Sequence, residues 1–107
     1  MNQDIKREWV AKLRSGKYEQ GRGRLRSKDD QYCCLGVLCE IGVEGGMIEP
    51  PILVGLDYLY NRNSAFLPNA LVEEYGLSTQ ETITLMGMND EQNKSFGQIA
   101  QYIEQNL

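Results

Sequence analysis

Three arginines that alternate with single residues near the start of the chain could bind phosphate. Arg22, Arg24 and Arg26 stand two residues apart, the spacing that places side chains on one face of an extended segment. Each guanidinium is a planar fork that can hold a phosphate through two hydrogen bonds. Gly21 and Gly23 would let a ligand approach the backbone. The pattern predicts a site for an anionic small molecule such as a nucleotide.

Three further residues complete this predicted site. Arg14 would add a fourth guanidinium on the phosphate, and Tyr18 or Tyr32 would stack on the base. Nothing in the sequence calls for a cofactor, so none is expected.

Basic residues are concentrated in residues 1–28, which we call the basic third. It holds nine lysines and arginines against three acidic residues, whereas residues 29–107 hold two basic residues against twelve acidic ones. Because the whole chain has a formal net charge of −4, duplex nucleic acid is an unsuitable partner. The alternative to an anion site is that the basic third pairs with the chain's own carboxylates, within one molecule or across a subunit boundary.

Two other function classes follow from the acidic residues. In the first, an acidic surface docks on a basic partner protein and inhibits it. The glutamates of that surface would be Glu40, Glu44, Glu49, Glu73, Glu74 and Glu81. In the second, Asp29, Asp30 or Asp90 serves a nucleotide hydrolase with a divalent metal. Nothing in the sequence marks a carboxylate pair as catalytic, so the sequence favours binding over catalysis and leaves an enzyme open.

The cysteines are expected to be core residues. The chain has no histidine and three cysteines, Cys33, Cys34 and Cys39, which stand among apolar residues. Structural zinc usually takes four Cys or His ligands, and a catalytic thiol usually has a partner base. We therefore expect neither a metal site nor a cysteine nucleophile.

Apolar periodicity predicts the first two helices. A helix capped by Asn2 or Asp4 would bury Ile5, Trp9 and Leu13 and end at Gly16. The nearly continuous apolar run 33–41 is predicted to be a buried helix that Gly42 ends. Residues 18–30 are predicted to be a short strand or an extended loop.

The second half of the chain should add a hairpin and three helices. Residues 52–60 have the β-branched and aromatic composition of a strand, which could pair with the arginine-rich segment. Pro68 suits the start of a helix ending at Gly76. Capping boxes at Ser78 and Ser95 predict two more helices. The inward residues would be Ile83, Leu85 and Met86 in the first of these, and Phe96, Ile99, Ile103 and Leu107 in the second.

The sequence thus predicts an α+β fold, mainly helical with about four to five helices and a small β-hairpin or short sheet. Residues 1–107 are expected to form one domain. No apolar run approaches the ~20 residues of a membrane span, and the N-terminus lacks a secretory signal. We expect a cytoplasmic protein with no membrane partner.

Three stretches of the sequence resemble a family of small proteins common in tailed bacteriophage genomes. They are Trp9-Val-Ala-Lys-Leu-Arg-Ser-Gly16, Tyr32-Cys-Cys-Leu-Gly-Val-Leu-Cys39, and Met88-Asn-Asp90 with Ser95-Phe96, Ile99-Ala100 and Ile103-Glu104. The resemblance covers most of the chain and is weakest over residues 42–63. It implies a viral origin and action in the bacterial host cytoplasm, with no established activity or catalytic residues to carry over.

Combined with the arginines, the resemblance suggests an anti-defence protein. We expect a sponge that sequesters a nucleotide immune signal of the host, acting as a homo-oligomer.

Overall fold

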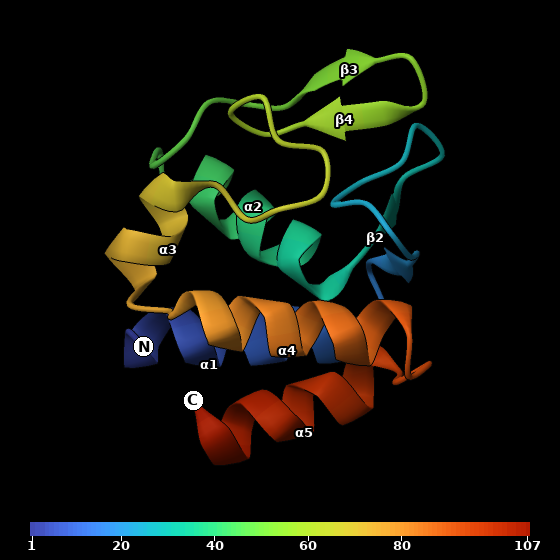
Figure 1. Ribbon diagram of the computed structural model, residues 1–107. Coiled ribbons are helices and arrows are strands. Elements are labelled where there is room, and N and C mark those ends of the chain that lie inside the picture. Colours follow the sequence, from blue (N-terminus) through green and yellow to red (C-terminus); the bar gives the residue numbers. More distant parts are fainter.

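Helix α2 (Cys34–Glu44) lies at the centre of the structure, a computed structural model that describes residues 1–107 (Figure 1). Its sequence is apolar on nearly every face, as expected for a helix surrounded by other elements. Most of its residues are buried, from Cys34 through Cys39 and again at Ile41 and Gly42. The prediction that this short apolar run forms a helix and not a strand is confirmed.

Three helices of 11 or 12 residues form a layer on one side of α2 (Figure 1). Helix α1 (Gln3–Arg14) packs on α2 and on α5 (Phe96–Asn106), and α4 (Thr79–Asp90) packs on the same two helices. Trp9 of α1 is fully buried, and its indole Nε1 donates a hydrogen bond to the carbonyl of Cys34 at 2.9 Å. The indole therefore fixes α1 at the start of the central helix.

The predicted helix starts are present. Asn2 Oδ1 accepts from the amide of Ile5, and Ser78 and Ser95 each form a complete capping box. The short helix α3 (Asn69–Tyr75) begins after Pro68 and ends at Gly76, whose φ of +71° suits glycine.

Two predictions about the helices were wrong, one on where α2 ends and one on which residue of α4 faces inward. Helix α2 continues through Gly42 to Glu44, because a glycine without Cβ lets the Leu71 side chain pack directly against the helix. Ile83 is 53% exposed, since the buried face of α4 consists of Thr82, Leu85, Met88 and Asn89. Because Thr82 and Asn89 are polar, the hydrophobic pattern of the sequence does not indicate this face.

The strands form two small sheets. Strand β1 (Glu19–Gln20) runs parallel to β2 (Gln31–Tyr32), and β3 (Ile52–Val54) pairs antiparallel with β4 (Asp57–Leu59). The hairpin thus lies within residues 52–59, turning at Gly55 with a φ of +65°. The expected pairing with the arginine-rich segment is also present, on the free side of β4, where the amide of Tyr58 donates to the carbonyl of Arg26 at 2.9 Å.

The α+β, mainly helical fold class is confirmed, with five helices and two two-stranded sheets. None of the helices is both long enough and apolar enough to cross a bilayer.

Candidate functional site

The arginines of the predicted anion site are dispersed, because three of the four lie beside carboxylates of the chain itself. Arg14 Nη1 lies 3.2 Å from Glu104 Oε2 on α5. Arg24 Nη1 lies 2.9 Å from Asp57 Oδ1 and forms an ion pair with it. The two groups lack hydrogen-bond geometry, so this buried oxygen has no hydrogen-bond partner. These pairs support the alternative in which the basic third is neutralised within the molecule.

Arg26 lies in a half-buried cluster on the inner side of its segment. Its Nη2 is 2.7 Å from Asp30 Oδ1, its Nη1 is 3.8 Å from Glu40 Oε2, and its guanidinium stacks 4.1 Å over the ring of Tyr58. Burial alone would lower the pKa of Arg26, but the neighbouring Asp30 and Tyr60 raise it overall. Arg26 is thus a permanent cation that holds the hairpin against α2.

The two tyrosines of the predicted site contact each other. Their rings meet edge to face with centroids 5.1 Å apart. Tyr32 is only 8% exposed, and burial, more than the charge of Arg26, sets its pKa, which rises to about 12. Tyr32 is therefore a core residue, while Tyr18 remains half-buried at its edge.

Arg22 and Arg24 do share a small hollow, which we call the basic hollow. It has a volume of about 220 Å³ and is lined by Gly21, Arg22, Arg24, Ser27, Asp29 and Gln31. Arg22 is exposed and forms no ion pair there. The hollow has no apolar wall, so it offers charge but no surface on which a nucleobase could stack.

Asn89 and Asp90 connect the arginine-rich loop, residues 18–30, to the helices through hydrogen bonds. Asn89 is fully buried, and its Oδ1 accepts from Gln20 Nε2 at 2.9 Å and from the amide of Cys34 at 3.3 Å. Its Nδ2 donates to the carbonyl of Gly21 and to Asp90 Oδ1, which also accepts from the amide of Gly23. This pair has a positioning role that no periodic pattern in the sequence could indicate.

The aspartates proposed for a hydrolase do not converge. Asp30 binds Arg26, Asp90 binds the loop amide, and Asp29 lines the basic hollow. The structure contains no group of three or more His, Cys, Asp or Glu side chains placed to hold a metal ion. The cysteines are buried, as predicted, and burial raises the pKa of Cys33 to about 11 and those of Cys34 and Cys39 well above the usual value.

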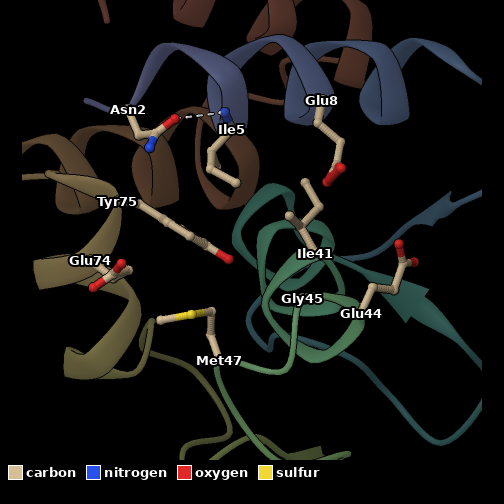
Figure 2. Close-up of a pocket in the computed structure, with 9 residues that line it drawn as sticks. All are labelled: Asn2, Ile5, Glu8, Ile41, Glu44, Gly45, Met47, Glu74 and Tyr75. Carbon is tan, nitrogen blue, oxygen red and sulfur yellow. Dashed lines mark hydrogen bonds between the residues drawn. The ribbon is translucent and has the colours of Figure 1, made fainter.

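The largest cavity lies elsewhere, where the start of α1, the end of α2 and the end of α3 meet (Figure 2). We call it the acidic pocket; its volume is about 440 Å³. It is lined by Asn2, Ile5, Glu8, Ile41, Glu44, Gly45, Met47, Glu74 and Tyr75. It contains three carboxylates and no basic side chain; the negative ends of the α2 and α3 dipoles and the positive end of the α1 dipole approach it.

The carboxylates of the acidic pocket are not equivalent. Glu44 is 3.4 Å from Lys12 Nζ, and although burial lowers the pKa of Lys12, Tyr18 and Glu44 raise it overall. Glu8 and Glu74 form no ion pair. Tyr75 is 3% exposed, and its pKa is raised by burial and also by the charges of Glu8, Cys39 and Glu74. The hydroxyl of Tyr75 therefore lies within the field of the two unpaired carboxylates.

The acidic surface predicted from the sequence is divided between this pocket and other places. Glu44 and Glu74 line the pocket, while Glu49 and Glu73 are exposed outside it and Glu81 is half-buried, where its carboxylate accepts from the amide of Ser78. Glu40 is not part of an acidic surface, because its carboxylate accepts a short hydrogen bond from the hydroxyl of Tyr60.

Glu8 lines the pocket but was not among the glutamates predicted from the sequence. Its spacing of three from Ile5 places it beside the apolar stripe, but only the tertiary structure brings it to α2 and α3.

Comparison with curated proteins and with solved structures finds no match to this chain. The family described as a domain of unknown function, DUF8296, matches residues 1–73, which include the basic third, α2 and the β3–β4 hairpin. Since this match covers more than half of the 107 residues, the chain belongs to the DUF8296 family.

Proposed function

We propose that this protein is a non-enzymatic phage accessory protein that binds a basic host protein through the acidic pocket. The observation that carries the proposal is that the largest cavity has three carboxylates, an apolar floor and no basic lining residue. Carboxylates on a pocket rim steer a cationic partner and favour it over neutral or anionic ones. The apolar floor supplies contact area that charge alone does not.

The experiment is a pull-down of interacting proteins from bacterial lysate with purified protein as bait. We expect the double variant Glu8→Lys/Glu74→Lys to recover at least about tenfold less partner, because it reverses both unpaired charges of the pocket. Recovery by wild type should also fall between about 0.1 M and 0.5 M salt, since screening weakens exposed charges.

The matched control is Glu49→Lys/Glu73→Lys, which makes the same change of net charge at two exposed glutamates outside the pocket. This control should recover the partner as wild type does. If both double variants lose the partner equally, binding depends on net charge and the pocket is not the docking site.

Sequestration of a nucleotide immune signal is the second candidate function. It is supported by Arg22, an unpaired guanidinium beside Arg24 in the basic hollow. It ranks second because Arg14, Arg24 and Arg26 already face carboxylates of the chain.

Calorimetry against linear and cyclic nucleotides would test this candidate. Binding should weaken about tenfold in Arg22→Ala, since that change removes a charge-assisted phosphate contact. It should be unchanged in Arg7→Ala, which removes an exposed arginine of α1 that pairs with Asp4. Absence of heat across the panel would eliminate the sponge.

A further inference from the structure

Tyr75 gives the acidic pocket a specific hydrogen-bonding chemistry. The residue is 3% exposed, yet Figure 2 shows its hydroxyl directed into the cavity, with no hydrogen bond to any other lining residue. Among fully buried side-chain atoms only Asp57 Oδ1 lacks a hydrogen-bond partner, so the Tyr75 hydroxyl is still reached by water through the cavity. A ligand that enters the cavity would replace that water and has to offer the hydroxyl a hydrogen bond in its place.

The walls around the hydroxyl are apolar. Ile5 comes from α1, Ile41 from α2 and Met47 from the loop after α2, and Figure 2 shows the three side chains around the phenol oxygen. Glu8 and Glu74 lie on opposite sides of this apolar lining. The cavity thus fits an aliphatic stem that ends in a positively charged hydrogen-bond donor.

We infer that the acidic pocket receives one lysine side chain of the partner protein, with the ammonium donating to Tyr75 Oη between Glu8 and Glu74. An ammonium has three donors and no acceptor, and the pocket offers it three unpaired acceptor groups. Lysine also carries a flexible four-carbon stem that can lie along Ile5, Ile41 and Met47. An anion would be repelled, and a neutral apolar guest would leave all three acceptors unpaired.

This inference rests on the proposed function, because it names the group by which the partner is held. The probe is n-butylamine, which reproduces the lysine side chain, titrated into the full chain with NMR detection. We expect saturable shifts of the Tyr75 ring and the Met47 methyl signals. We expect 1-butanol, which has the same stem without the charge, to bind at least about tenfold more weakly.

Two substitutions test the individual contacts. Tyr75→Phe should weaken butylamine binding about tenfold and should fold normally, because the missing hydroxyl makes no hydrogen bond to the pocket. Glu74→Gln should weaken it about threefold, since an exposed carboxylate is screened by water. The controls are Tyr102→Phe on α5 and Glu73→Gln, the neighbouring glutamate that does not line the pocket; both should bind as wild type does.

The results separate the two proposals. Equal butylamine affinity in wild type and Tyr75→Phe, or no shift at Tyr75 and Met47, overturns the lysine inference. If the pull-down still depends on Glu8 and Glu74 in that case, the docking function stands without an inserted lysine. If butylamine binds as expected and no protein partner is recovered, the ammonium site stands with a free amine as its ligand, and the docking function falls.

Discussion

We expect Gly36→Ala to lower the free energy of unfolding by about 4 kcal/mol or more, which would remove most of the stability of the fold. A Cβ at position 36 would lie 1.8 Å from the carbonyl oxygen of Leu25 and 2.7 Å from its carbonyl carbon. Both atoms are backbone, and Leu25 is itself fully buried. Neither backbone segment can therefore move to relieve the clash without separating the arginine-rich loop from α2. Thermal unfolding followed by circular dichroism would measure the loss.

The matched control is Gly87→Ala in α4. A Cβ there meets no atom nearer than Gln92 Nε2 at 3.9 Å. Alanine stabilises a helix interior by up to about 1 kcal/mol relative to glycine, so this variant should melt no lower than wild type. A Gly36→Ala variant that unfolds within a few degrees of wild type would show that the loop does not approach α2 so closely.

The helices could be predicted from the sequence because their signals are local. The stripe Ile5, Trp9 and Leu13 repeats at the helical period, and each capping box lies within four residues. Gly42 misled the same reasoning, since a glycine that ends a helix and one that admits a neighbour look alike in the sequence. The neighbour, Leu71, is 29 residues further along the chain.

The candidate sites depend on contacts that are not local. Alternation predicted that Arg22, Arg24 and Arg26 share one face. It could not indicate that Glu40 and Tyr58 would hold the guanidinium of Arg26 apart from the other two. Likewise, Glu8, Glu44 and Tyr75 belong to three different helices, and their convergence follows from how α1, α2 and α3 pack. The distribution of charge in the sequence indicated an acidic surface and, as an alternative, pairing of the basic third with carboxylates. It could not indicate that carboxylates and apolar side chains together line the acidic pocket.

Asn89→Asp is expected to destabilise the protein by about 4 kcal/mol at pH 7. The substitution keeps the shape of the side chain but replaces the Nδ2 donor with an oxygen. That oxygen would face two acceptors, the carbonyl of Gly21, now 2.9 Å from Nδ2, and Asp90 Oδ1, now at 2.8 Å. The site is fully buried, so the introduced carboxylate would also lose its hydration.

The dependence on pH distinguishes this cause from a simple loss of packing. Burial and Asp90 should raise the pKa of the introduced carboxyl above its unfolded value of about 4, so the charge part of the penalty is absent below that pH and grows by about 1.4 kcal/mol per pH unit above it. The protonated carboxyl has one donor where the amide has two, so the loss of one hydrogen bond remains at every pH. Urea denaturation should therefore give a difference from wild type that is about 2.5 kcal/mol larger at pH 7 than at pH 5. Asn69→Asp is the control, since Asn69 is exposed in the first turn of α3, where a carboxylate is favourable. A penalty at position 89 that stays constant with pH would mean that lost geometry, and not buried charge, opens the loop; a negligible penalty would mean that Asn89 does not fasten the loop at all.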